Sequence, residues 1–343
     1  MKGSVLKKFL CTCLVTAAAF AATTISASAC TTIYVGGDLV EEGTPFVART
    51  EDYGSDYNKL WFISESGKWK QGDHYVGCPE YGPFEWDFTH DSYRFTYFTN
   101  DIYYDGICPE CGEKADHYSY TEFGTNEKGV SVSATETLYG NEKVTEADPY
   151  RDAEWAEANK SERIGIEETD IPTIILAEAS SAREGVKLLL DIYENYGCVA
   201  ASGVFVCDKD EAWYVENCSG TQYVAIKLND NMIFLEPNMA VIGRVDLDDE
   251  NVIASKDLIA VAKKAGTFVG DEAKNIIDFR ASYARISEKM DQRMIDGLNY
   301  LNATYKYDSD TLVADNTKFT ISNLDASDKL VALYTNILSL IHI

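Results

Sequence analysis

A cysteine that follows a cleavage signal can serve as both nucleophile and base. Cys30 comes directly after the small residues Ala27-Ser28-Ala29, a pattern typical of the site where signal peptidase cuts an exported chain. As the first residue of a chain, a cysteine carries a thiol and an α-amine, and an α-amine with a pKa of about 7.7–8.0 takes up the thiol proton near neutral pH. The sequence therefore predicts nucleophilic chemistry at Cys30.

The residues before Cys30 have the three parts of a secretory signal. Three lysines among the first eight residues precede an apolar run over 9–22, which is shorter than the roughly 20 apolar residues that span a bilayer as a helix. We therefore predict that residues 1–29 are a signal peptide, that the protein is secreted or held at the cell surface, and that the cleaved chain contacts no membrane.

A lipid anchor is the alternative use of Cys30, since bacterial lipoproteins also begin with cysteine after small residues. Ala27 stands where such signals favour a large aliphatic residue, and the apolar run Thr31–Val35 begins without the polar linker usual in lipoproteins. A lipidated Cys30 would make the chain a surface binding protein, because acylation and a thioether would consume both the amine and the thiol. We favour the unmodified cysteine.

The composition argues against several other classes of function. The chain has 56 acidic and 30 basic residues, whereas nucleic acids are bound through clusters of Lys and Arg. Its 343 residues are 45% apolar, which suffices for a large core. Only four His occur, and the motifs of serine hydrolases, zinc peptidases and phosphate-binding loops are missing. We expect no cofactor and no nucleic-acid partner; a homo-oligomer stays open.

The elements that must position Cys30 are mainly strands, with helices following. Apolar runs bounded by turns predict strands, and 3.6-residue spacing predicts helices, which together indicate a layered α+β fold in one domain. Residues 65–117, rich in aromatics, look like an insertion or an active-site rim. The predicted strands are Thr31–Val35, Pro45–Ala48, Leu60–Ile63, Arg94–Phe98, Tyr118–Phe123, Val130–Ala134, Gly203–Cys207, Ala212–Glu216, Tyr223–Leu228, Met232–Leu235 and Ala240–Ile242, and the predicted helices lie within Pro172–Gly197, Leu258–Ala265 and Asn275–Leu301.

An ordered series of short motifs resembles the N-terminal-nucleophile dipeptidases, cysteine peptidases related to penicillin V acylase and the conjugated bile acid hydrolases. Each motif is weak alone, but the series covers most of residues 30–285. The resemblance implies a four-layer αββα fold, with the hydrolase domain over residues 30–337. The motifs are Cys30–Ile33, Ala48–Asp52, Gly124–Val130, Ser133–Thr137, Asn141–Lys143 with Ala147–Pro149, Ala182–Val186 and Glu211–Glu216.

The resemblance implies catalytic roles for three residues of the first motifs. Cys30 would attack the carbonyl carbon of a peptide bond and form a thioester. Arg49 would favour the thiolate by its charge, and Asp52 would hold the α-amine of Cys30 in place. The residues alone also allow a plain ion pair between Arg49 and Asp52.

The resemblance assigns three further site residues later in the chain. Asn126, in the sequence Asn-Glu-Lys-Gly, is similar to the superfamily's oxyanion-hole asparagine, although it also fits a simple turn residue. Asn238 looks like a second site asparagine of the superfamily, and Arg280 looks like its late arginine.

The activity implied by these motifs is that of an exported cysteine dipeptidase acting on small peptides. The alternative within the superfamily is an amidase that cleaves N-acyl amino acids or bile salts. A dipeptidase must accept a free substrate amine, so an acidic pocket favours the peptidase and an apolar pocket favours the acylase. The abundance of Asp and Glu leans toward the peptidase.

The remaining cysteines of the exported chain are even in number, which permits disulfides outside the cytosol. Cys108-Pro109-Glu110-Cys111 is half of a zinc site, but a second such pair is missing, so we expect rim cysteines and no metal. Asp246–Glu250 resembles half a calcium loop and fits a solvated turn better. The six cysteines are Cys78, Cys108, Cys111, Cys198, Cys207 and Cys218, of which the last three are predicted to be small buried hydrophobes.

The last six residues have an unusual coding signature. Leu338–Ile343 is what CTG TCT CTT ATA CAC ATC encodes, a transposon end used to prepare sequencing libraries. We predict that residues 338–343 are an adapter scar and that the hydrolase domain is truncated at its C-terminus.

Overall fold

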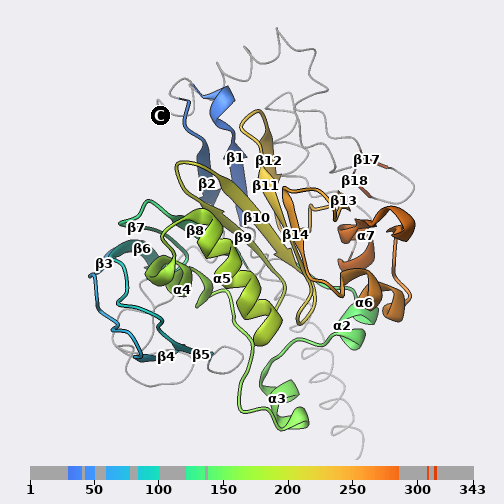
Figure 1. The fold of residues 1–343 in the computed structure, drawn as a ribbon, viewed down its shortest axis with the longest axis horizontal. Helices are drawn as coiled ribbons and strands as arrows, with labels where there is room; N and C mark the ends of the chain where they lie inside the picture. Colours follow the sequence, from blue (N-terminus) through green and yellow to red (C-terminus); the bar gives the residue numbers. More distant parts are fainter. Residues whose placement is uncertain are drawn as a thin grey trace, which may run out of the picture.

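Two antiparallel sheets form the centre of the computed structural model, which describes residues 30–40, 43–50, 59–77, 84–100, 121–135 and 138–285 and two short strands beyond them (Figure 1). The larger sheet has the strand order β14-β11-β10-β9-β8-β7-β6-β3, and the smaller has the order β12-β1-β2. Their strands are β1 (Thr31–Val35), β2 (Phe46–Thr50), β3 (Lys59–Ser64), β6 (Phe95–Asn100), β7 (Phe123–Asn126), β8 (Ser131–Thr135), β9 (Ser202–Cys207), β10 (Ala212–Asn217), β11 (Tyr223–Leu228), β12 (Ile233–Glu236) and β14 (Val252–Ala254).

Smaller elements surround these two sheets. The short strands are β4 (His74–Val76) paired with β5 (Glu85–Asp87), the sheet of β13 (Arg244–Asp246), β16 (Ile276–Asp278) and β15 (Gly270–Asp271), and β17 (Tyr307–Asp308) paired with β18 (Val313–Ala314). The helices are α2 (Glu142–Ala147), α3 (Ala153–Asn159), α4 (Ile171–Glu178), α5 (Ala182–Asn195), α6 (Leu258–Ala265) and α7 (Phe279–Tyr283), with 3-10 turns η1 (Gly37–Leu39) and η4 (Glu272–Lys274).

Alternation along the central strands divides the interior into two cores, because successive side chains of a strand point to opposite faces. In β9, Val204 and Val206 are buried in the core that α4 and α5 cover, whereas Phe205 belongs to the core shared with the smaller sheet. The Phe205 ring lies 4.7 Å from Tyr214 of β10 and 5.6 Å from Phe234 of β12, centroid to centroid. These aromatic rings pack the two sheets against each other.

Helix α5 closes the outer face of the larger sheet. Its N-cap Ser181 accepts a hydrogen bond from the backbone N–H of Glu184, and its buried residues include Val186 and Leu189 at the spacing of one helix face. The helix ends before Gly197, whose φ of +79° suits glycine. Figure 1 shows α4 and α5 in front of the larger sheet.

The predicted α+β fold is confirmed. The described residues show a helical layer of α4 and α5, then the larger sheet, then the smaller sheet, which are three of the four predicted layers. Among the same residues, no helix has both the length and the apolar character to cross a bilayer. The predicted boundaries of β1, β11 and α6 match the observed ones.

Four sequence predictions about elements need correction. The strand predicted at Tyr118–Phe123 is observed as β7, Phe123–Asn126, and the described residues Thr121 and Glu122 lie outside it. Ala240–Ile242 is not a strand, because the N–H groups of Val241 and Ile242 donate to the carboxylate of Glu216 instead of to another strand. The predicted helix Asn275–Leu301 begins instead with strand β16, and only the five residues of α7 are helical up to residue 285. The described part of segment 65–117 contributes Tyr75 and Phe88 to the core, so that it is more than a rim.

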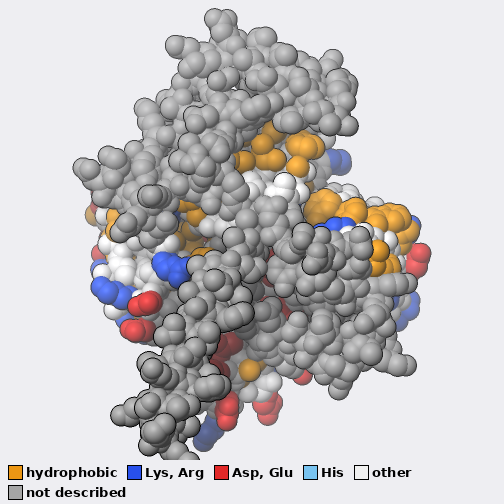
Figure 2. Space-filling model, turned by 180° about the vertical axis from the view of Figure 1, so that it is seen from behind, with side chains coloured by type: hydrophobic (Ala, Val, Ile, Leu, Met, Phe, Trp, Pro, Cys, Tyr) orange, Lys and Arg blue, Asp and Glu red, His pale blue; other side chains and the backbone are white. Residues whose placement is uncertain are grey.

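Apolar surface gathers on strands of both sheets. Figure 2, seen from behind, shows patches of apolar side chains beside charged groups. The large apolar side chains with exposed fractions of 37–54% include Trp61 and Ile63 of β3, Phe98 of β6 and Phe46 of β2. These three strands also supply lining residues of the pocket described below.

Asn126 anchors the turn between β7 and β8. Its amide nitrogen donates to the carbonyls of Leu176 (3.0 Å) and Ala179 (2.7 Å), and its amide oxygen accepts from the N–H groups of Lys128 and Val130 (both 3.0 Å). The side chain is buried, so these four bonds satisfy backbone groups that water does not reach. Asn126 thus ties the hairpin to the end of α4.

We predict that Asn126→Ala lowers the free energy of unfolding by about 2–4 kcal/mol, since each buried group left unpaired costs about 1–3 kcal/mol. Urea denaturation would measure the loss. The matched control is Asn195→Ala, whose amide also donates to a backbone carbonyl, that of Asp191, but in an exposed position; we expect a change within about 0.5 kcal/mol there. Equal effects of the two substitutions would contradict the anchoring role.

Candidate active site

Cys30 lies at the start of β1, the central strand of the smaller sheet. Its side chain is 4% exposed, and β1 pairs with β2 on one side and β12 on the other. Thr32 stands opposite Arg49 of β2 and opposite Glu236 of β12. Since Cys30 is two residues from Thr32, the side chains of Cys30 and Arg49 fall on the same face of the sheet. Strand register therefore brings a cation to the thiol.

The guanidinium of Arg49 is held between the two sheets. Its Nη2 lies 3.4 Å from Sγ of Cys30 and 3.5 Å from a carboxylate oxygen of Glu168. Its Nη1 donates to the carbonyls of Ala134 (2.7 Å) and Glu122 (3.1 Å), which belong to the larger sheet and its border. Contacts in several directions fix this planar group, and a fixed cation beside a thiol stabilises the thiolate.

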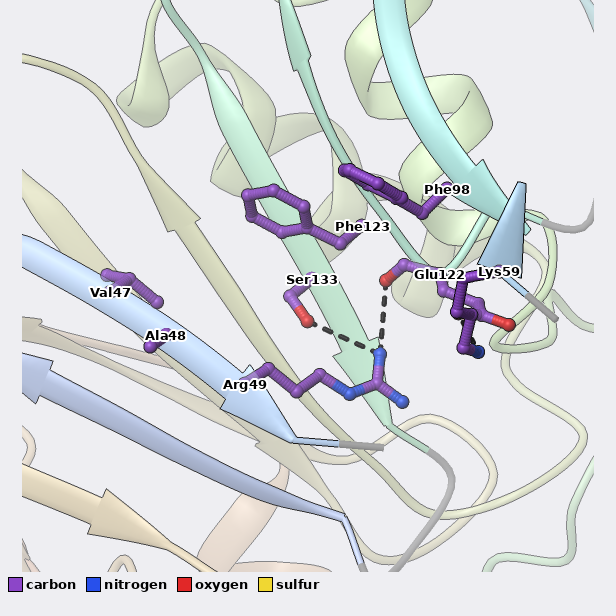
Figure 3. Close-up of a pocket in the computed structure, with 8 residues that line it drawn as sticks. All are labelled: Val47, Ala48, Arg49, Lys59, Phe98, Glu122, Phe123 and Ser133. Atoms are coloured by element: carbon purple, nitrogen blue, oxygen red, sulfur yellow. Dashed lines mark hydrogen bonds and ion pairs between the residues drawn. The ribbon is translucent and has the colours of Figure 1, made fainter. Parts of the chain in front are cut away.

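A pocket of about 470 Å³ opens beside Arg49 (Figure 3). This volume lies within the range of small-molecule sites. Part of the lining is apolar, and part carries charged and hydroxyl groups. The apolar lining, which we term the apolar wall, consists of Val47 and Ala48 on one side and Phe98 and Phe123 on the other, and the polar lining consists of Arg49, Lys59, Glu122 and Ser133. The pocket can therefore hold a ligand with both an apolar and a charged part.

An ion pair closes the polar side of this pocket. Nζ of Lys59, the first residue of β3, lies 2.5 Å from Oε2 of Glu122, just before β7. Burial raises the pKa of Glu122, while the bond to Lys59 and the charge of Arg49 oppose the rise. Burial lowers the pKa of Lys59, and the thiol of Cys30 is among the charges that act on it in the opposite direction. The pair is thus electrostatically linked to the thiol of Cys30.

Asn126 is not brought to Cys30. Arg49 reaches the carbonyl of Glu122 just before β7, whereas Asn126 ends β7, about 13 Å further along the strand at 3.3 Å per residue. Both hydrogens of its amide are donated to the end of α4. The expected oxyanion contact is therefore replaced by the turn role described above.

Asn238 lies two residues beyond the end of β12, whose last residue, Glu236, pairs with Thr32 of β1. Continued pairing would set Asn238 opposite Cys30, but the observed pairing extends no further than Thr32 and Glu236. Asp52 lies outside the described residues, although it follows β2, which ends at Thr50. The catalytic roles assigned to Asn238 and Asp52 therefore stay predictions.

Arg280 belongs to a buried polar cluster in the core between the sheets. Its side chain is 3% exposed, and its charge acts on Glu216, whose pKa burial raises to about 7. The Glu216 carboxylate accepts from the hydroxyl of Tyr214 and from two backbone N–H groups. Arg280 thus stabilises a buried carboxylate, and a direct role at Cys30 stays a prediction.

Of the three cysteines that were predicted to be buried, two are buried. Cys198 and Cys218 are buried, whereas Cys207 is half-buried, with a pKa that burial raises to about 11. Cys78, Cys108 and Cys111 lie outside the described residues. Within the described residues, no cluster of three His, Cys, Asp or Glu side chains could hold a metal ion, and this includes Asp246–Glu250.

Sequence reasoning missed Lys59, Glu122 and Glu168. Lys59 directly precedes a predicted strand, and Glu122 interrupts the apolar run Tyr118–Phe123. A charged residue inside or beside an apolar strand is the signal that marks such positions, because it requires a buried partner. The partner itself could not be found by spacing, since the two residues are 63 positions apart.

Comparisons with known proteins identify a family and relatives of this chain. The model of peptidase family C69 matches residues 29–310. A probable dipeptidase B of Streptococcus pyogenes serotype M6 is 32% identical over 304 residues, which cover 87% of this chain and 55% of the relative. A dipeptidase of Bifidobacterium longum is 33% identical over 222 residues, covering 64% of this chain and 39% of the relative. The chain spans about half the length of the curated relatives it matches.

Solved structures show a more distant likeness. Penicillin V acylase from Agrobacterium tumefaciens is 12% identical, with a TM-score of 0.38, and the match covers 91% of this chain and 71% of that one. A mutant of conjugated bile acid hydrolase from Clostridium perfringens is 13% identical, with a TM-score of 0.30 and coverages of 92% and 73%. The family match, together with the relatives of similar sequence, confirms the predicted resemblance, and the chain belongs to peptidase family C69.

Proposed function

We propose that this chain is an exported cysteine dipeptidase in which Cys30, as the N-terminal residue, is the nucleophile. The observation that carries the proposal is the 3.4 Å contact between Sγ of Cys30 and the guanidinium of Arg49, at the edge of a pocket that suits a small ligand. Membership of peptidase family C69 supports cleavage of a peptide bond. Relatives named as dipeptidases support short peptides as substrates.

The reaction begins with a proton transfer within one residue. The neutral α-amine of Cys30 takes the thiol proton, and the thiolate attacks the carbonyl carbon of the substrate to give a tetrahedral oxyanion. As the C–N bond breaks, the α-ammonium returns this proton to the leaving amine, and a thioester remains. The amine then takes a proton from water, the resulting hydroxide attacks the thioester, and cleavage of the C–S bond releases the acid.

Arg49 stabilises the thiolate by charge while its own position is fixed by two backbone carbonyls. Asn238, two residues beyond the Glu236 that pairs with Thr32, donates to the oxyanion. Asp52 holds the α-ammonium through its carboxylate. One well-aimed donor to an oxyanion contributes about 2.7–4 kcal/mol of transition-state stabilisation.

Export and activation are one event in this proposal. Cleavage between Ala29 and Cys30 removes the signal peptide and creates the α-amine that serves as base. The uncleaved chain has an amide at this nitrogen and therefore lacks the base.

A second candidate is an amidase acting on N-acyl amino acids. The observation that favours it is the apolar wall of the pocket, formed by Val47, Ala48, Phe98 and Phe123. The ion pair of Lys59 and Glu122 on the other side favours a charged substrate group and hence the dipeptidase.

The mature N-terminus is the first test. Mass spectrometry of protein exported by a bacterial host should give a chain that begins at Cys30 with an unmodified amine and thiol. A diacylglyceryl thioether with an acylated amine would instead support the lipid-anchored surface protein. A chain cleaved elsewhere would overturn the N-terminal nucleophile.

We predict that Cys30→Ser lowers kcat/KM for dipeptides by about 10²-fold or more, since an α-amine deprotonates a hydroxyl far less readily than a thiol. The matched control is Cys207→Ser, a half-buried cysteine at the end of β9, which should keep its activity. Full activity in the Cys30 variant would refute the mechanism.

We predict that Arg49→Gln slows alkylation of Cys30 by iodoacetamide at pH 7 by about threefold or more and lowers kcat/KM by about tenfold or more, because the thiolate loses its cation. Peptide mapping by mass spectrometry measures the alkylation rate. Arg94→Gln is the control, since Arg94 is a half-exposed residue that pairs with Glu65 at 3.4 Å. An unchanged alkylation rate at Cys30 would contradict the role of Arg49.

A further inference from the structure

Within the described part of the chain, one oxygen of the Glu122 carboxylate has no hydrogen-bond partner. The side chain is 5% exposed, and its Oε2 is bound by Lys59. The other oxygen, Oε1, is buried and accepts no hydrogen bond from any described residue. Leaving a buried acceptor unsatisfied is unfavourable, and more so when the group is charged. An oxygen in this state beside a pocket is suited to accept a hydrogen bond from a ligand.

Glu122 and Cys30 contact the same guanidinium group. Nη1 of Arg49 contacts the backbone carbonyl of Glu122 at 3.1 Å, and Nη2 of the same group contacts Sγ of Cys30 at 3.4 Å. In a dipeptide the α-nitrogen is about 2.5 Å from the carbonyl carbon that is attacked. An α-ammonium bonded to Glu122 thus brings its own carbonyl toward the thiol.

The same pocket offers room for an apolar side chain next to that amine. Figure 3 shows Phe98 and Phe123 on the side of the pocket away from Val47 and Ala48, with Glu122 and Lys59 together at one end. The rings of Phe98 and Phe123 are stacked, 6.4 Å apart between centroids. Apolar and aromatic side chains bind such walls through burial of their surface.

We propose that Glu122 binds the free α-ammonium of the substrate and that the wall of Val47, Ala48, Phe98 and Phe123 accepts an apolar or aromatic N-terminal side chain. This inference rests on the proposed dipeptidase function and names its substrate class. Lys59 is a positioning residue, because it orients Oε2 and leaves Oε1 for the ligand. An N-acylated substrate brings a neutral amide to this position and so forfeits the charge-assisted hydrogen bond.

The test compares Phe-Ala with N-acetyl-Phe-Ala in the wild-type chain that begins at Cys30 and in Glu122→Gln. We expect the wild type to prefer the free amine by about 100-fold in kcat/KM. The substitution should lower kcat/KM for Phe-Ala by about 10- to 100-fold, mainly through KM, and leave N-acetyl-Phe-Ala unchanged, so that the preference collapses. Glu157→Gln, an exposed position on α3, is the matched control and should keep the wild-type preference.

Three outcomes separate this inference from the function it rests on. A wild type that cleaves both substrates equally well, or a Glu122→Gln variant that loses both activities equally while keeping its thermal midpoint, overturns the amine site and leaves the peptidase standing. A wild type that cleaves neither substrate refutes the proposed function. If Glu122→Gln does not fold, Lys59→Met takes its place, and an unchanged preference in that variant overturns the inference.

Discussion

The guanidinium of Arg49 connects the two sheets at the point where Cys30 lies. Arg49 belongs to the smaller sheet, yet it donates to the carbonyls of Ala134 and Glu122 on the larger one. Its distance to the thiol therefore depends on how the sheets pack through rings such as Phe205, Tyr214 and Phe234. A shift of one sheet over the other would strip this buried cation of its acceptors, which is costly. The geometry around Cys30 is accordingly fixed by the whole sandwich.

Strands were predictable wherever backbone pairing followed the apolar pattern. The runs Thr31–Val35 and Tyr223–Leu228 are strands with the expected boundaries. The strand predicted at Ala240–Ile242 is wrong, because the second and third N–H groups of this run donate to the carboxylate of Glu216. That residue is 25 and 26 positions away from the two donors. The local strand propensity of a segment carries no information about so distant an acceptor. The helix predicted from Asn275 onward is wrong at residues 276–278 for a similar reason, because these residues pair with β13 as a strand despite their helical spacing.

The residues of the candidate site also differ in whether the sequence alone could reveal them. Cys30 and Arg49 lie on adjacent strands of one hairpin, and a motif in the sequence sufficed to find both. The motif around Asn126 was also real, but what it encodes is a buried turn anchor whose acceptors, Leu176 and Ala179, lie on the far side of the sheet. The pair of Lys59 and Glu122 exists only after β3, β6 and β7 have assembled. Its discovery required the fold.

The β1–β2 hairpin and the β3–β6–β7 group therefore encode two different properties. The hairpin carries the thiol and its cation, which in the proposed mechanism set the rate of the reaction. The other strands carry most of the pocket wall and its ion pair, which choose what is held near the thiol. Substitutions at positions such as Phe98 and Phe123 can accumulate without touching the reactive pair. A lineage with this architecture can diversify its substrates while its chemistry stays constant.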